Sequence, residues 1–148
     1  ELAVQTEPCF SLIGSDISPR AIDAAKHNME ALNQRLSRQK LKLPSYRLIK
    51  GEMDEVYEST IKDYKNVVLF SNPPYGMQVN SGLPGEAPTQ LYTRIRKLAT
   101  KANIKAAFVA THGEAFLRSK VVGSRWEIAG KTKSGGLTLK FLYKMIRR

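Results

Sequence analysis

Four consecutive residues combine a stiff backbone with hydrogen-bond acceptors, just after an apolar run at 67–70: they are Asn72, Pro73, Pro74 and Tyr75. Each proline fixes its own φ and restricts the residue before it, so the chain around Asn72 is rigid. Neither proline has an N–H, and the Asn72 amide adds another carbonyl oxygen. The segment therefore presents a rigid row of acceptors suited to an –NH2 group, beside a Tyr75 ring that can stack on a base. The alternative interpretation is a simple proline-rich loop.

A second chemically suggestive residue, Asp16, ends the apolar run at 10–15 and precedes Ser18-Pro19. An ionised aspartate is an acceptor only, so it can receive hydrogen bonds from two neighbouring hydroxyl groups. It could instead cap the helix that follows. Ser18 is better placed for that role, because serine is a favoured N-cap and proline suits the first helical position.

The elements that position these residues alternate between strand and helix. Apolar runs predict strands over residues 10–15, 46–50, 67–70 and 106–110. One helix is predicted from Ser18-Pro19, followed by a basic connector over 33–44. A basic amphipathic helix is predicted over 90–102. Segments 125–129 and 137–146 predict a terminal hairpin.

This alternation predicts an open, mostly parallel α/β sheet that closes with an antiparallel hairpin, in one domain over residues 1–148. The nearly uniform apolar run at 67–70 indicates a strand buried on both faces. Ligands of such sheets bind beyond the carboxyl ends of the strands. We therefore expect a site formed by Asp16 and by residues 51–52, 71–72 and 111–112.

The segment Ser71-Asn72-Pro73-Pro74-Tyr75-Gly76 resembles the Asn-Pro-Pro-Tyr motif of amino-methyltransferases, which act on N6 of adenine, N4 of cytosine or N2 of guanine. The resemblance implies that Asn72 and the Pro73 carbonyl accept hydrogen bonds from the target amine, that Pro74 stiffens the loop, and that Tyr75 stacks on the base. It also places Asn72 beside the cofactor.

Two upstream segments resemble cofactor motifs of class I methyltransferases. Residues 13–22 resemble the second motif, which implies that Asp16 accepts hydrogen bonds from the ribose hydroxyls and that Ile17 adjoins the cofactor. Lys50-Gly51-Glu52-Met53 is similar to the third motif, usually Gly-Asp-Ala, from which Glu52 and Met53 depart. There the resemblance implies contacts of Glu52 and Met53 with the adenine.

Nearly the whole chain resembles the RNA methylase family whose members often carry a THUMP domain. The resemblance implies a Rossmann-like class I fold, S-adenosylmethionine as cofactor, and N2 of guanine in rRNA or tRNA as target. The family also has a first strand and a Gly-rich cofactor loop, which this sequence lacks. That strand would lie between those leading to Asp16 and Asn72. We therefore expect a C-terminal part of a catalytic domain, with an additional N-terminal segment or RNA-binding domain supplying the remainder.

Charge also favours a nucleic acid. The sequence has 24 Lys and Arg against 13 Asp and Glu, a formal net charge of +11. Lysine and arginine that neutralise phosphates release counterions, so a surplus of this size suits RNA. The single cysteine, Cys9, allows no intrachain disulfide and no zinc cluster. These features predict a cytoplasmic protein with no membrane partner and no metal site.

Several alternatives remain open from the sequence. The same chemistry could act on DNA adenine N6 or cytosine N4, or on a protein glutamine. A catalytically inactive, basic RNA-binding module is a third possibility. His27 is expected on a solvated face, and His112 at the edge of the site. Four residues of the basic helix suggest either a phosphate-contacting face or an ordinary solvated one: Arg94, Arg96, Lys97 and Lys101.

Overall fold

The computed structural model describes residues 9–73, 88–112, 116, 126–134 and 137–145. The chain divides into two compact units, Glu1–Ser59 and Thr60–Arg148. None of the helices in the described segments is both long and apolar enough to cross a membrane. Each unit is built from its own sheet.

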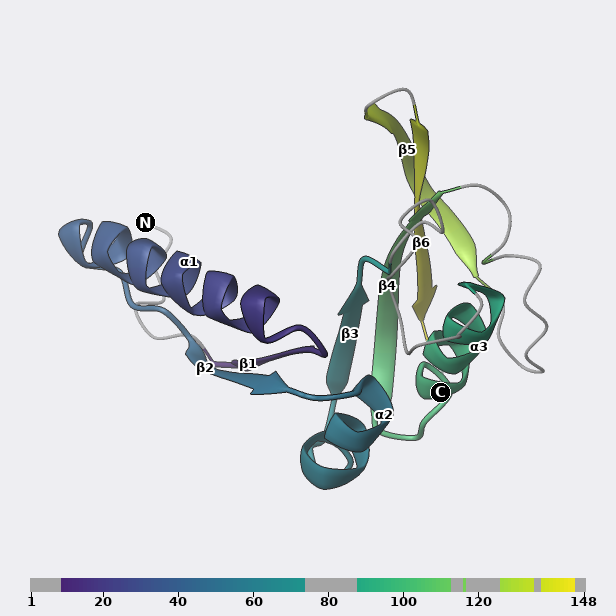
Figure 1. Ribbon diagram of the computed structural model, residues 1–148, viewed down its shortest axis with the longest axis horizontal. Helices are drawn as coiled ribbons and strands as arrows, with labels where there is room; N and C mark the ends of the chain where they lie inside the picture. The colour runs from purple at the N-terminus through teal and green to yellow at the C-terminus, as the bar shows by residue number, and fades with distance from the viewer. Residues whose placement is uncertain (1–8, 74–87, 113–115, 117–125, 135–136, 146–148) are drawn as a thin grey trace, which may run out of the picture. The chain divides into compact units, whose positions relative to one another are not determined.

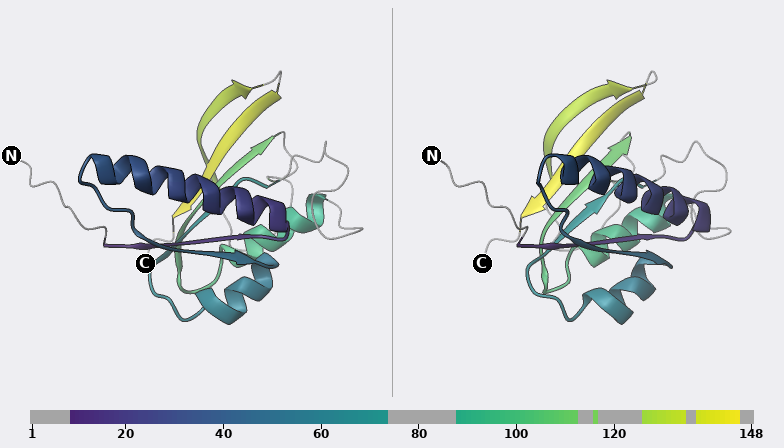
Figure 2. Two further views of the ribbon diagram at one scale, coloured as in Figure 1. Left: turned by 60° about the vertical axis from the view of Figure 1, so that its left-hand side comes forward. Right: turned by 90° about the vertical axis from the view of Figure 1, so that its left-hand side faces the viewer.

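The first unit contains a two-stranded parallel sheet. Strand β1 (Ser11–Asp16) and strand β2 (Ser45–Lys50) pair from Ser11↔Ser45 to Asp16↔Lys50. Helix α1 (Pro19–Arg38) connects the two strands and runs along this sheet (Figures 1 and 2). Both predicted strands are therefore confirmed, within one or two residues.

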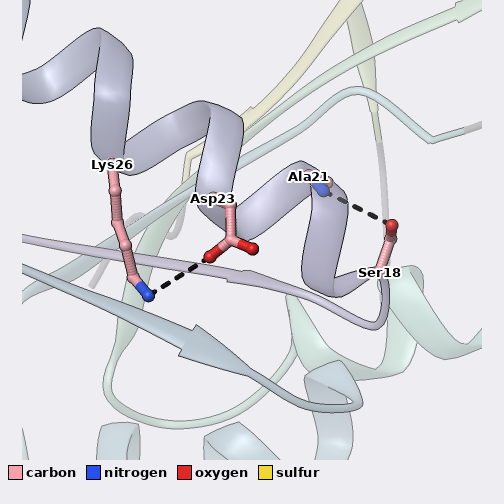
Figure 3. Close-up of polar contacts among 4 residues, drawn as sticks. All are labelled: Ser18, Ala21, Asp23 and Lys26. Carbon is pink, nitrogen blue, oxygen red and sulfur yellow. Dashed lines mark hydrogen bonds and ion pairs between the residues drawn. The ribbon is translucent and has the colours of Figure 1, made fainter.

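The start of α1 follows the sequence prediction. Ser18 is the N-cap, and its side-chain oxygen accepts a hydrogen bond at 3.3 Å from the Ala21 backbone N–H (Figure 3). One turn later, Lys26 Nζ lies 3.4 Å from Asp23 Oδ1. Both of these side chains are exposed, so the ion pair contributes little to stability.

The end of α1 differs from the prediction. The helix continues to Arg38, so the basic connector predicted over 33–44 is wrong in its first half. Arginine, leucine and glutamine are good helix formers, and Pro44 is the first residue in that segment that must stop a helix. Arg35 and Arg38 lie in the last turn, where positive charge is favourable.

A short helical segment that the sequence analysis did not predict follows β2. It consists of α2 (Met53–Val56) and a π-helical turn, η1 (Tyr57–Ile61). Val56 and Tyr57 are buried. Their burial anchors a segment too short to show a helical apolar period.

The second unit contains a four-stranded sheet with the order β3-β4-β6-β5 (Figure 1). Its strands are β3 (Val67–Ser71), β4 (Ile104–His112), β5 (Glu127–Ser134) and β6 (Leu137–Met145). Strands β3 and β4 are parallel, whereas β6 is antiparallel to both β4 and β5. The predicted terminal hairpin is thus confirmed, with β5 extending further than expected.

One face of this sheet forms the core of the second unit with helix α3 (Pro88–Leu98), which ends four residues before the predicted bound. The helix buries one side, and alternate residues of β4 and β6 are buried with it. The main buried residues are Tyr92, Ile95, Leu98, Ala107, Val109, Phe116 and Leu142.

The other face of the sheet is exposed. Phe70 is 74% exposed and stacks on Phe108, with ring centroids 5.1 Å apart, and Phe108 stacks in turn on Tyr143 at 6.4 Å. The prediction that the strand at 67–70 is buried on both faces is therefore wrong for the described structure. Its physical cause is that α3, the only described helix packed on this sheet, covers one face alone.

No strand among the described residues pairs with β3 on its side away from β4, or with β1 on its side away from β2. The described residues therefore form two separate sheets. The strand expected between the one ending at Asp16 and the one leading to Asn72 stays a prediction.

Candidate active site

The candidate residues lie in two groups, each at the carboxyl ends of strands. Asp16, Ile17, Glu52 and Met53 belong to the first unit, whereas Asn72 and Pro73 belong to the second. Pro74 and Tyr75 lie outside the described residues. Within the first unit, the paired ends of β1 and β2 bring four of the residues predicted for the cofactor to one edge of the sheet.

Asp16 is the last residue of β1 and its side chain is exposed. One carboxylate oxygen, Oδ1, accepts a hydrogen bond at 2.7 Å from the Ser18 backbone N–H. This contact makes the tight turn by which an aspartate orders the backbone two residues ahead. Helix α1 is capped by Ser18 and not by Asp16. The contact with the Ser18 N–H holds the Asp16 carboxylate in place, while its second oxygen has no hydrogen-bond partner among the described residues.

The adjacent strand brings Glu52 to the same edge of the sheet. Asp16 is paired with Lys50, and the Gly51 backbone N–H donates a hydrogen bond to the Asp16 carbonyl at 3.0 Å. Glu52 follows at once as the N-cap residue of α2, and its carbonyl accepts a hydrogen bond from the Val56 N–H at 2.9 Å. Two acidic residues therefore follow the ends of neighbouring strands, and one backbone hydrogen bond, from Gly51 to Asp16, joins the two chain segments there.

Gly51 allows this close arrangement. A Cβ atom built at Gly51 would lie 3.0 Å from Cγ2 of the buried Val56, so a larger residue would push α2 away from the end of β2. Met53, half-buried, is the first residue of α2, and Ile17 is 39% exposed beside Asp16. An apolar residue thus follows each of the two acidic residues in the sequence.

In the second unit, Asn72 directly follows the last residue of β3 and is exposed, while Pro73 is buried. Burial of Pro73 fixes the chain at this point, so the adjacent Asn72 is carried on a restrained backbone. Ser71 pairs with Val109 of β4, which ends three residues later at His112. Asn72 therefore lies at the carboxyl edge of the sheet, as the sequence predicts.

The basic helix corrects one prediction. Arg96 is only 6% exposed, so it does not contribute to a phosphate-contacting face. Its Nη1 donates a hydrogen bond at 3.0 Å to the Phe116 carbonyl, and its guanidinium carbon lies 5.5 Å from the centre of the Phe116 ring. Lys97 and Lys101 are exposed and Arg94 is half-buried. His27 is exposed, as expected.

Burial also changes the proton affinity of two basic groups in the second unit. It lowers the pKa of Arg96 below its ordinary value. The pKa of Lys144 is lowered from 10.5 by burial, and further by the positive charge of Arg96. These two side chains belong to the core, not to the carboxyl edge where Asn72 lies.

Three lysines of the terminal hairpin are not among the predicted site residues. Lys131 pairs directly with Lys140, and Lys133 lies two residues from Lys131 on the same face. Lys131 and Lys133 are exposed and Lys140 is half-buried. The alternation of lysine at 131 and 133 was the available signal, since residues two apart in a strand share a face.

Comparison with known proteins supports the architecture. No protein-family model matches the sequence, and no curated protein is similar to it. Among solved structures, the fold is similar to that of SMU.472, a proposed methyltransferase crystallised with SAH, with a TM-score of 0.57 at 18% identity. It is also similar to yhhF of Escherichia coli, a proposed methyltransferase, with a TM-score of 0.50 at 12% identity.

Each similarity extends over 93% of this chain but covers only 32% of SMU.472 and 64% of yhhF. At these identities the comparison concerns the fold alone. The sheet order β3-β4-β6-β5, the parallel pair β1-β2 and the antiparallel β6 agree with that fold. The described residues have a Rossmann-like fold of the class I methyltransferase type.

Proposed function

We propose that the protein transfers a methyl group from S-adenosylmethionine to an exocyclic amino group of a base in RNA, with N2 of guanine in rRNA or tRNA as the favoured target. The observation that carries the proposal is the position of Asn72-Pro73 directly after β3, at the carboxyl edge of a sheet with methyltransferase topology. An Asn-Pro-Pro-Tyr segment at this place is suited to a flat, amine-bearing ring.

The first unit fits the proposed cofactor. Asp16 offers a carboxylate whose Oδ1 is fixed by the Ser18 N–H, which leaves the other oxygen for hydroxyl donors such as those of a ribose. Glu52, on the neighbouring strand end, is suited to accept from an adenine amino group, with Ile17 and Met53 providing apolar contact. SMU.472, which shares the fold, was crystallised with SAH.

S-adenosylmethionine would supply a methyl group on a positively charged sulfur. The protein's own task is then to hold the amine nitrogen in line with that methyl group. Asn72 and the Pro73 carbonyl accept hydrogen bonds from the two N–H groups of the amine. These contacts direct the nitrogen lone pair at the methyl group. The nitrogen loses one proton to water as it gains the methyl group. Positioning of this kind needs no base with a shifted pKa.

RNA is the target best supported by the charge of the chain. A formal net charge of +11 favours a polyanion, and a base must leave its stack to reach a pocket at a sheet edge. We also propose that an additional N-terminal segment or RNA-binding domain of the same protein takes part in binding the RNA.

The test is single-turnover transfer of labelled methyl groups to bulk RNA by the full chain and by Asn72→Ala. We expect the variant to lose about 10²–10³ in rate with unchanged cofactor affinity, because one preorganised polar contact in the transition state is removed. Asn28→Ala, on the exposed side of α1, is the matched control and should retain the normal rate. Normal rates for Asn72→Ala would show that the motif is only a rigid loop.

Parallel assays with RNA, DNA and protein as methyl acceptors distinguish the alternative functions. Label in DNA or protein but not in RNA would replace the proposed target by DNA adenine or cytosine, or by glutamine. RNA binding with no cofactor binding and no label would identify an inactive RNA-binding module.

A further inference from the structure

The β5–β6 hairpin extends beyond the rest of its sheet. Strand β4 ends at His112, which pairs with Leu139, whereas β6 begins two residues earlier at Leu137 and pairs there with β5 alone. The hairpin therefore projects past the carboxyl end of β4, as Figures 1 and 2 show. This is the same edge of the sheet at which Asn72 follows β3.

One face of the hairpin is basic, from the last residues of β4 to the projecting end. Lys131 and Lys140 are directly opposite each other, and Lys133 is opposite Thr138 on the same face. We call these four residues the hairpin basic face: Lys131, Lys133, Thr138 and Lys140. Like charges directly opposite each other destabilise a strand pair, and Lys133 lies on the diagonal of Lys140, where long side chains still meet.

No acidic residue among the described residues of the hairpin shares this face. Glu127 is the only carboxylate of the two strands, and it is paired with Tyr143 on the opposite face, where it accepts a hydrogen bond from the Tyr143 hydroxyl. Lys131, Lys133 and Thr138 are exposed. A cluster of ammonium groups and a hydroxyl on an exposed ribbon is suited to phosphate oxygens.

The distance from the proposed site suits a substrate contact. Strands β6 and β5 are the second and third strands from β3, so at a strand spacing of about 4.8 Å they lie roughly 10–15 Å from it across the sheet. Lys140 is level with Thr111, close to the end of β4, and Lys133 lies further out. A polynucleotide with one base at Asn72 could thus present a neighbouring phosphate to the hairpin.

We propose that the hairpin basic face binds the phosphodiester backbone of the RNA substrate and positions the target base at Asn72. This inference rests on the proposed function for its choice of RNA. The face contributes affinity and register, not sequence recognition, because phosphates carry no base information. Its effect should appear in the salt dependence of binding and in KM for RNA, with kcat little changed.

The test compares two double variants of the full chain. Lys131→Gln/Lys133→Gln removes two charges from the hairpin basic face. Lys62→Gln/Lys65→Gln removes two charges from exposed positions before the amino end of β3, at the opposite edge of the sheet. Fluorescence anisotropy with an RNA oligonucleotide, and with DNA of the same sequence, is measured from about 50 to 200 mM salt.

We expect the hairpin variant to reduce the slope of log K against log salt by about 1.4–1.8, the value for two lost phosphate contacts, while the control keeps the wild-type slope. SAH affinity should be unchanged in both variants. Equal slopes for the two variants, or a loss of SAH binding in the hairpin variant, would overturn the inference but leave the proposed function intact. Weakened binding of DNA alone would also overturn it. Wild-type protein that binds no RNA at low salt would overturn both.

Discussion

Replacement of Asp16 by asparagine separates the two roles of this side chain. Asparagine retains a carbonyl oxygen, which can still accept the hydrogen bond from the Ser18 N–H that spans 2.7 Å in the structure. It replaces the second carboxylate oxygen by an –NH2 group, which cannot accept from a hydroxyl. The turn into α1 should therefore survive, while the proposed ribose contact is lost.

The magnitude follows from the contact that is removed. A hydrogen bond to a charged group contributes about 1.5–3 kcal/mol, which corresponds to a roughly 10- to 150-fold loss of cofactor affinity. Asp16→Ala should lower the affinity for the cofactor by the same factor as Asp16→Asn. It should also lower the free energy of unfolding by about 1 kcal/mol, because the Ser18 N–H loses its acceptor. The difference between the two variants isolates the structural role.

Calorimetric titration with SAH and thermal unfolding measure these two effects. Asp23→Asn is the matched control, since Asp23 is an exposed aspartate in the same unit whose partner Lys26 lies 3.4 Å away. It loses the same charge, and a surface ion pair contributes at most about 1 kcal/mol to stability. Normal SAH affinity in Asp16→Asn, or equal weakening in Asp23→Asn, would refute the assignment of Asp16 to the cofactor.

Two further predictions concern stacking and pH. Tyr75→Ala should slow methyl transfer by roughly 5- to 150-fold, because stacking on a base contributes about 1–3 kcal/mol, whereas Tyr75→Phe should remain close to wild type in the same single-turnover assay. A large loss in Tyr75→Phe would instead indicate that the hydroxyl is essential. The lowered pKa of Lys144 means that the unfolded chain binds more protons in the interval between that pKa and 10.5, so the free energy of unfolding should rise with pH there. Urea unfolding at several alkaline pH values measures this rise, which Lys144→Met should flatten; an equal rise in the variant would assign it to other groups.

Much of the fold could be predicted because its signals are local. The Ser18-Pro19 start of α1, the strand that ends at Asp16 and the strand that leads to Asn72 each depend on a few adjacent residues, and the structure confirms all three.

What the sequence did not predict depends on distant partners. Arg96 looks like a solvated helix residue, yet its guanidinium meets the Phe116 carbonyl 20 positions away, a contact that no helical period can indicate. Phe70 lies in a run typical of two-sided burial, but exposure is decided by which faces other elements cover. Helix α1 ends later than predicted, at Arg38, because arginine stabilises the last turn of a helix as well as it suits a connector.

The sequence predicts which strand ends carry the site residues, but it does not predict which of these strand ends are neighbours in the sheet. Asp16 and Glu52 are brought to one edge by the pairing of Asp16 with Lys50, which the spacing of the two strands in the sequence does not fix. The projection of the hairpin past β4 likewise depends on the register of β6, which places Lys131 opposite Lys140.

The central claim is methyl transfer to an exocyclic amine of RNA, and the most direct measurement is the identity of the modified nucleoside. The full chain is incubated with bulk RNA and methyl-labelled S-adenosylmethionine, and the RNA is digested to nucleosides and analysed by mass spectrometry. We predict labelled N2-methylguanosine. Label on a ribose hydroxyl or a ring carbon, or unlabelled RNA under conditions in which the cofactor is bound, would contradict the account.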